Sequence, residues 1–103
     1  MKGQTKIELG GKDIPIKFTL GVIEDLKEWG KKHKIEDVDN DPKGQRIMFA
    51  LMEIYASDNW ENVDTVELAE KESAKYKGLG IDQVSKMLQM VEETTGKLKG
   101  ANQ

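Results

Sequence analysis

The stretch Gly10–Trp29, GGKDIPIKFTLGVIEDLKEW, holds a turn, an alternating apolar strand and the start of a helix within twenty residues. Ile14, Ile16 and Phe18 alternate with other residues, which is typical of a strand that buries one of its two faces. The residues that follow change to the spacing of an amphipathic helix. The stretch therefore predicts a strand that leads directly into a helix.

A hairpin over about residues 4–18 is predicted, because the residues before the turn alternate in the same way. Pairing Leu9 with Ile14 would place the apolar side chains of both strands on one face. Pro15 has no N–H to donate, so it should occupy a pair that exchanges no hydrogen bonds. We therefore expect a four-residue loop, Gly10–Asp13, and an outer edge that is blocked at Pro15.

About four helices should follow the hairpin, which makes the fold class α+β, mainly α. Thr19 is a suitable cap for the first helix, and Asp41, followed by Pro42, for the second. Gly96 is expected to end the last helix. The expected helices cover about residues 20–33, 42–57, 65–77 and 81–95.

A chain of 103 residues forms one domain. We expect a single hairpin-plus-helices domain over residues 1–96 and a flexible tail over 97–103. The chain has no cysteine and a net charge of -3, so neither a disulfide scaffold nor a general attraction to nucleic acid or anionic lipid is expected. It also has no apolar run of the roughly 20 residues that span a membrane, and we expect a cytoplasmic protein.

The acidic loop before residue 42 resembles a calcium loop only in part. Asp37, Asp39 and Asp41 match the first, third and fifth positions of an EF-hand. Pro42 stands where the sixth position needs glycine, and Met48 stands where the twelfth needs glutamate. We expect a solvated loop that caps a helix, and no metal site.

No arrangement of residues predicts catalysis. His33, the sole histidine, lies near a helix end among lysines and beside no recognisable nucleophile motif. The segment 78–80, GLG, lacks the third glycine and the preceding strand of a phosphate-binding turn. We therefore expect no enzyme activity and no cofactor.

Four apolar side chains exceed what the helical faces need: Phe49, Met52, Met87 and Met90. They either fill gaps in the core, as methionine does well, or form an adaptable partner-binding surface. Both interpretations stay open, and the four are the candidate partner-binding residues. If they form a surface, polar replacement of Phe49 and Met90 should weaken binding and leave stability nearly intact.

The junction Phe18–Gly21, FTLG, running into Val22–Lys27, VIEDLK, resembles the start of the tail assembly chaperones of long-tailed phages and prophages. The similarity is best over residues 4–29. The small size, helix content and acidic balance of the chain are also similar to those of these chaperones. The chain looks like one encoded by a phage or prophage of a Gram-positive host.

The resemblance implies a protein that binds the tape measure protein, keeps it soluble and helps to recruit tail tube subunits. It further implies self-association and no enzyme activity. Many such chaperones also exist in a longer, frameshifted form, and Gly96-Lys97 can be encoded by a slippery run of G and A. The alternative is a small non-enzymatic adaptor or regulatory domain that binds a host or phage protein through an apolar helical groove.

Overall fold

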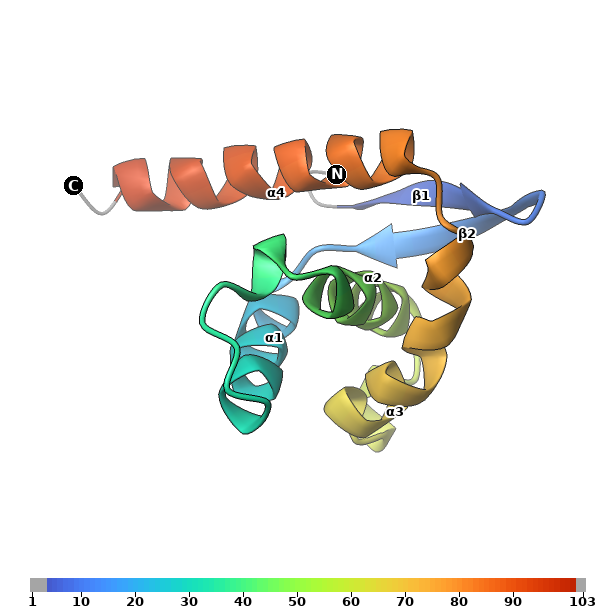
Figure 1. The fold of residues 1–103 in the computed structure, drawn as a ribbon, viewed down its shortest axis with the longest axis horizontal. Coiled ribbons are helices and arrows are strands. Elements are labelled where there is room, and N and C mark those ends of the chain that lie inside the picture. Colours follow the sequence, from blue (N-terminus) through green and yellow to red (C-terminus); the bar gives the residue numbers. More distant parts are fainter. Residues whose placement is uncertain (1–3, 102–103) are drawn as a thin grey trace.

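The computed structural model describes the backbone of residues 4–101 and the side chains of residues 5–93. It is an α+β fold, mainly α, in which an antiparallel hairpin precedes the helices, as predicted (Figure 1). The elements are β1 (Gln4–Leu9), β2 (Lys12–Lys17), α1 (Leu20–Lys32), η1 (Val38–Asn40), α2 (Pro42–Ala56), η2 (Trp60–Asn62), α3 (Thr65–Glu72), η3 (Ser73–Gly78) and α4 (Ile81–Ala101), where η marks a 3-10 helix. In this described part of the chain, no helix is long and apolar enough to cross a membrane.

The hairpin turn consists of Gly10 and Gly11, whose φ angles are +59° and +79°. Glycine adopts this left-handed region without the steric cost of a Cβ, and two-residue turns of this kind match the twist of the strands. Leu9 therefore pairs with Lys12. The expected four-residue loop and the expected pairing of Leu9 with Ile14 are wrong.

The buried face of the hairpin is nevertheless the predicted one. Ile7 pairs with Ile14 instead of Ile16, and a shift of two residues keeps every side chain on its original face. Ile7 and Ile16 are both buried. Pro15 lies opposite Lys6, at a pair that exchanges no hydrogen bonds when pairing alternates from a two-residue turn. The proline thus occupies the kind of position that we expected, in a different register.

Helix α1 begins directly after the hairpin, as predicted. Thr19 caps it, because its Oγ1 accepts a hydrogen bond from the Val22 N–H at 3.3 Å. Val22, Leu26 and Trp29 are buried and fix the face that packs on the core.

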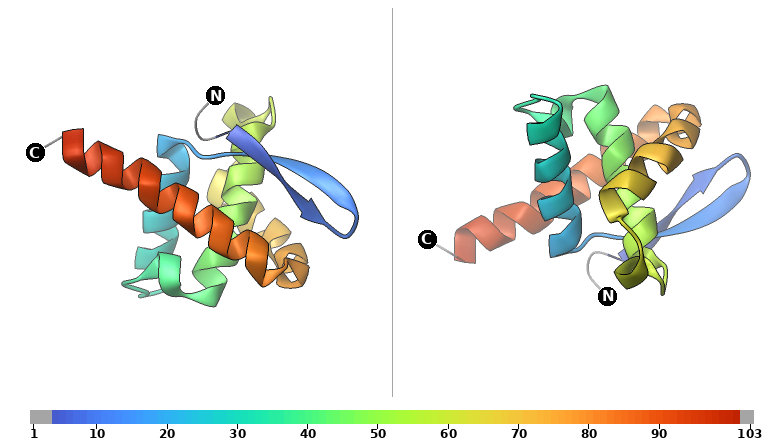
Figure 2. Two further views of the ribbon diagram at one scale, coloured as in Figure 1. Left: turned by 90° about the horizontal axis from the view of Figure 1, so that it is seen from above. Right: turned by 90° about the horizontal axis from the view of Figure 1, so that it is seen from below.

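Helix α2 lies at the centre, in contact with β2, α1 and α3 (Figures 1 and 2). Asp41 caps it as predicted, with Oδ2 accepting from the Gly44 N–H at 3.0 Å, and Pro42 is its first residue. All residues from 47 to 52 are buried. A helix buried on every side must be enclosed by several elements, so α2 organises the core.

The helix expected over residues 65–77 is α-helical only as far as Glu72, and η3 continues it as a 3-10 helix. Asp64 caps α3 by accepting from the Glu67 N–H at 3.1 Å. Ala69 and Tyr76 are the buried residues of this segment. The tighter winding of η3 carries Tyr76 onto α2, where its ring stacks on Phe49.

Helix α4 begins at the predicted Ile81 and runs to Ala101. The expected end at Gly96 is therefore wrong, since one glycine inside a helix costs only about 1 kcal/mol. Viewed from above in Figure 2, α4 crosses over the rest of the molecule and its C-terminal part extends beyond it. Residues 102 and 103 lie outside the described residues, and the flexibility of the tail stays a prediction.

Candidate partner-binding site

The four candidate residues do not share a surface. Phe49 and Met52 are 1% and 0% exposed, and Met87 is also buried. Only Met90 is half-buried, and it packs against the core from α4. Of the two interpretations that were open for Phe49 and Met52, the burial of both side chains supports the core, because α2 is covered on every side. Their role in binding a partner is therefore unsupported by their location.

One face of α4 rests on the core without being enclosed by it. Met87 is buried, whereas Ile81 is 75% exposed. The remaining apolar residues of this face pack against the core in half-buried positions: Val84, Leu88, Met90 and Val91. Within residues 81–93 this apolar stripe is thus only partly covered.

Gln83 joins the first turn of α4 to β1. Its Oε1 accepts from the Glu8 N–H at 2.7 Å, and its Nε2 donates to the Glu8 carbonyl at 2.6 Å. These two backbone groups point away from β2, because the pair of Glu8 with Asp13 exchanges no hydrogen bonds. Gln83 therefore occupies the edge of β1, and Pro15 blocks the edge of β2. Both edges of the sheet are closed to further strands at these positions.

A hollow of about 130 Å³ lies where α2, η3 and the start of α4 meet. Phe49 and Tyr76 form part of its lining from one side, and Leu79 and Val84 line it from the segment that leads into α4. Phe49 therefore lies at the inner end of a seam between α2 and α4.

The residues that carry the family resemblance have structural roles. Phe18 packs against the core, and Thr19 caps α1. A Cβ on Gly21 would lie 2.5 Å from the ring of Tyr55, so this position has no room for a side chain. Leu26 is buried. The pattern is thus explained by the junction between hairpin and helix.

Asp25 connects three helices. Its Oδ2 accepts hydrogen bonds from the Tyr55 hydroxyl at 2.6 Å and from the Thr65 hydroxyl at 2.5 Å. Burial raises the pKa of Tyr55, and the hydrogen bond to Asp25 raises it further by a smaller amount. The carboxylate therefore holds α1, α2 and the start of α3 together.

Glu53 makes a second link of this kind between α2 and η3. It accepts from the Tyr76 hydroxyl at 2.6 Å and from Lys75 Nζ at 2.8 Å. Burial, reinforced by the hydrogen bond to Glu53, raises the pKa of Tyr76. Burial opposes the charge of Lys75, but its hydrogen bonds to Glu53 and Glu72 outweigh that effect and raise its pKa.

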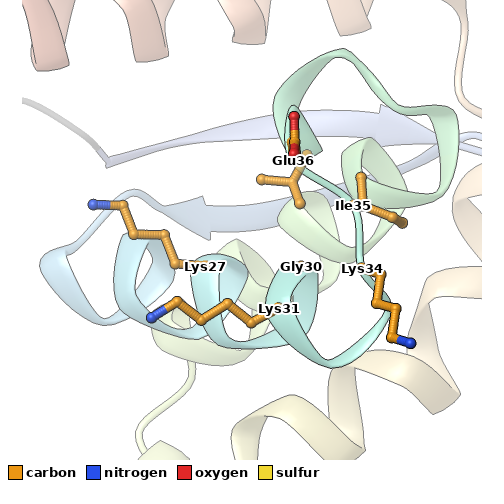
Figure 3. A pocket seen from close by; sticks show the side chains of 7 residues that line it. Lys27, Gly30, Lys31, Lys34, Ile35 and Glu36 are labelled. Atoms are coloured by element: carbon orange, nitrogen blue, oxygen red, sulfur yellow. The ribbon is translucent and has the colours of Figure 1, made fainter.

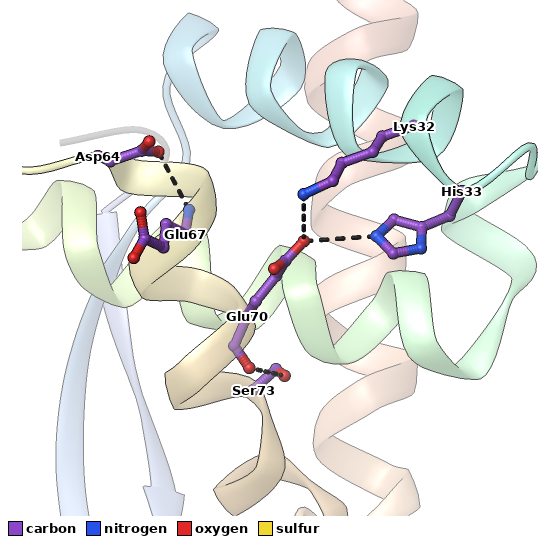
Figure 4. Close-up of polar contacts among 6 residues, drawn as sticks. All are labelled: Lys32, His33, Asp64, Glu67, Glu70 and Ser73. Atoms are coloured by element: carbon purple, nitrogen blue, oxygen red, sulfur yellow. Dashed lines mark hydrogen bonds and ion pairs between the residues drawn. The ribbon is translucent and has the colours of Figure 1, made fainter.

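His33 takes part in a contact between α1 and α3 (Figure 4). Its Nε2 lies 3.4 Å from Glu70 Oε1, and Lys32 Nζ lies 3.5 Å from the same oxygen. The His33 ring also packs on Trp29, with ring centroids 4.7 Å apart. Since these groups are partly exposed, the ion pair between Lys32 and Glu70 contributes at most about 1 kcal/mol. These contacts explain His33 as a residue that helps to hold α1 against α3.

The acidic loop makes hydrogen bonds within itself. Asp37 accepts from the Asn40 side-chain amide at 2.8 Å, which lowers the pKa of Asp37. The hydrogen bond with Asp37 raises the pKa of Asp39, and burial raises it further by a smaller amount. Among the side chains described, no group of three or more His, Cys, Asp and Glu gathers as metal ligands would.

One feature was missed by the sequence reasoning. Lys27, Lys31 and Lys34 line a hollow of about 430 Å³ at the end of α1, with Lys34 extending to the opposite side from Lys27 and Lys31 (Figure 3). None of these lysines was among the candidate binding residues predicted from the sequence. The signal available in the sequence was the four-residue spacing of Lys27 and Lys31, two like charges on one helix face.

Comparisons with protein-family models, with curated proteins and with solved structures found no match to this chain.

Proposed function

We propose that this chain is a tail assembly chaperone of a long-tailed phage or prophage, acting in the host cytoplasm. It binds the tape measure protein, keeps it soluble and helps to recruit tail tube subunits, without catalysis. The observation that carries the proposal is the packing of α4, an amphipathic helix whose apolar stripe rests on the core in mostly half-buried positions.

A surface that accepts one amphipathic helix can accept another. Val84, Leu88 and Val91 are spaced so that one face of α4 meets the core, with Met87 buried among them. A tape measure helix with the same spacing can bind beside this stripe or take the place of α4, in the helix-in-groove mode. Methionines at 87 and 90 suit such an exchange, because their side chains adapt to different neighbours.

The closed edges of the hairpin fit this role. Pro15 and Gln83 occupy the outer edges of the two strands, so a bound chain is directed to the helical surface and not to strand pairing. A chaperone that must hold a long apolar helix in solution benefits when both edges of its own sheet are obstructed in this way.

Co-expression tests the proposal. The chain should keep the product of a neighbouring long, helix-rich gene soluble and co-purify with it. Val84→Asp with Leu88→Asp should abolish co-purification, because both side chains belong to the stripe. The matched control, Ser85→Asp with Gln89→Asp, adds the same charge at exposed residues of the same helix and should retain it. Equal loss in both variants would contradict a role for the stripe.

The gene itself gives an independent test. The codons for Thr95–Lys99 should contain a slippery run with an open −1 frame, and a very long helix-rich reading frame should follow. Unrelated neighbouring genes and no slippery run would favour the alternative, an adaptor or regulatory domain. Self-association, which the resemblance also implies, is measurable by light scattering.

A further inference from the structure

A hollow of about 430 Å³ lies between the C-terminal half of α1 and the segment that follows it (Figure 3). Three lysines line it: Lys27 and Lys31 from α1, and Lys34 from the chain just after the helix. Apolar groups line the rest, together with Glu36. The volume is within the range of about 300–1,000 Å³ that is typical of ligand-binding clefts.

The three lysines have no ion-pair partner among the described side chains. Four other lysines, Lys6, Lys32, Lys71 and Lys75, do form ion pairs. Lys27 and Lys31 lie four residues apart on one helix, where like charges repel. In a chain with a net charge of -3, the lining of this hollow carries three lysines and one carboxylate, that of Glu36, so its net charge is positive.

The backbone of Lys34 has a φ of +58°, and it is the one non-glycine residue in the described part of the chain with positive φ. The helix ends in a Schellman motif, because the Ile35 N–H donates to the Gly30 carbonyl at 2.8 Å and the Lys34 N–H to the Lys31 carbonyl at 3.2 Å. Glycine is the preferred residue at this position. Lys34 therefore carries a modest backbone cost at this position, and its side chain lines the hollow.

The floor of the hollow is apolar. A Cβ on Gly30 would lie 2.4 Å from Val38 Cγ1, so the missing side chain lets Val38 pack directly against the helix. Ile35 and Val38 are half-buried, which leaves part of each in contact with solvent. The hollow therefore combines an apolar floor with a basic rim.

We propose that this hollow binds an acidic protein segment in which Asp or Glu residues flank one large apolar side chain. The carboxylates pair with Lys27, Lys31 and Lys34, and the apolar side chain lies on Ile35 and Val38. A nucleic acid fits less well, because no aromatic side chain among the described residues lines the hollow on which a base could stack, whereas its apolar floor suits an aliphatic side chain. The proposal is independent of the tail-assembly role and of the α4 stripe.

A fluorescein-labelled peptide with one leucine between glutamates is the probe, and fluorescence anisotropy at low salt is the measurement. Lys27→Gln, Lys31→Gln and Lys34→Gln together should weaken binding at least about tenfold, since three charge-assisted contacts are lost. The control, Lys12→Gln, Lys77→Gln and Lys86→Gln, changes the net charge equally and should have less than about a twofold effect. Equal weakening by both variants, or no binding by the unaltered chain, would overturn the proposal.

Two further measurements separate this site from a merely basic surface. A peptide with serine in place of leucine should bind more weakly, because the apolar floor is then unused. Lys34→Gly should also weaken binding of the leucine peptide while raising the thermal midpoint of unfolding, because glycine relieves the backbone strain. Unchanged binding by Lys34→Gly, or tighter binding of phosphatidylserine vesicles or single-stranded DNA than of the peptide, would overturn it.

Discussion

The positive φ of Lys34 is a measurable cost to the stability of the chain. A side chain in the left-handed region destabilises the folded state by about 1–2 kcal/mol. Replacing it by glycine removes this cost, but glycine loses more backbone entropy on folding, which offsets about half of the gain. Lys34→Gly is therefore expected to raise the free energy of unfolding by about 0.5–1 kcal/mol in urea titrations. Lys31→Gly, inside the same helix, should lower it by about 1 kcal/mol. Destabilisation by both variants would show that Lys34 is unstrained.

Tyr76 links stability to alkaline pH. Burial and the hydrogen bond to Glu53 raise its pKa in the folded chain, whereas an unfolded tyrosine titrates near pH 10. Above about pH 10 the unfolded state loses a proton that the folded state keeps, so the free energy of unfolding falls as pH rises. The stabilisation is complete below that pH.

Tyr76→Phe should therefore cost about 1–2 kcal/mol at neutral pH, through the lost hydrogen bond to a charged group, and should make the alkaline decline shallower. Urea titrations between about pH 8 and 11 measure both effects. Tyr55→Phe is the matched control, since Tyr55 also donates to a carboxylate and has a raised pKa but is less buried. An unchanged slope in Tyr76→Phe would assign the decline to other groups.

Phe49 is a core residue, so the condition under which its replacement would leave stability nearly intact, a surface position, is not met. It is 1% exposed and stacks on Tyr76 with ring centroids 5.8 Å apart. Phe49→Ala is expected to cost about 3–5 kcal/mol. Met90→Ala, at a half-buried position on α4, should cost less than about half of that. Equal losses in thermal or urea unfolding would contradict the difference in burial.

At the scale of elements, the hairpin register depends on the turn and not on the strands. A Cβ on Gly10 would meet no atom within 4 Å, so substitution there changes only the backbone preference. Asparagine tolerates positive φ, and Gly10→Asn should be nearly neutral. Gly10→Val should cost about 1–2 kcal/mol, because a β-branched residue is strained in this region. Urea unfolding separates the two, and a neutral valine variant would argue against this turn.

The same elements show what the sequence could predict. Thr19 and Asp41 were predicted as caps because capping depends only on residues three positions apart. The register was missed because a slip of two residues leaves the same faces buried, so the hydrophobic pattern could not distinguish the two pairings. The positive φ of the Gly10-Gly11 turn carried the missing information.

At the scale of the whole molecule, the candidate residues depend on packing that no single helix reveals. Phe49 and Met52 lie outside the main apolar face of their helix. Such residues either pack on a second part of the core or lie on the surface. In the structure, the hairpin and other helices enclose α2, so both side chains belong to the core. The lysine hollow depends on the chain after α1 folding back on Gly30, a tertiary contact that the sequence pattern does not contain.

The uneven packing of α2 and α4 predicts uneven protection across the molecule. Residues 47–52 of α2 are all buried, whereas Met87 is the one buried side chain of α4 within the described residues 81–93. Local opening follows the stability of the contacts that hold each element. Amides of α2 should therefore exchange hydrogen only through global unfolding, and those of α4 through a smaller opening that leaves the core intact.

Hydrogen exchange followed by mass spectrometry measures this difference directly. Amides in peptides from α4 should exchange orders of magnitude faster than amides in peptides from α2. Low concentrations of urea should raise the exchange rate of α2 far more than that of α4, because global unfolding exposes more surface than the local opening of α4 does. Gln83→Ala removes the side chain that joins α4 to β1, so it should speed α4 further and leave α2 nearly unchanged. Equal protection of the two helices would mean that α4 is integral to the core, and exchange of α4 for a partner helix would then require unfolding of the whole domain.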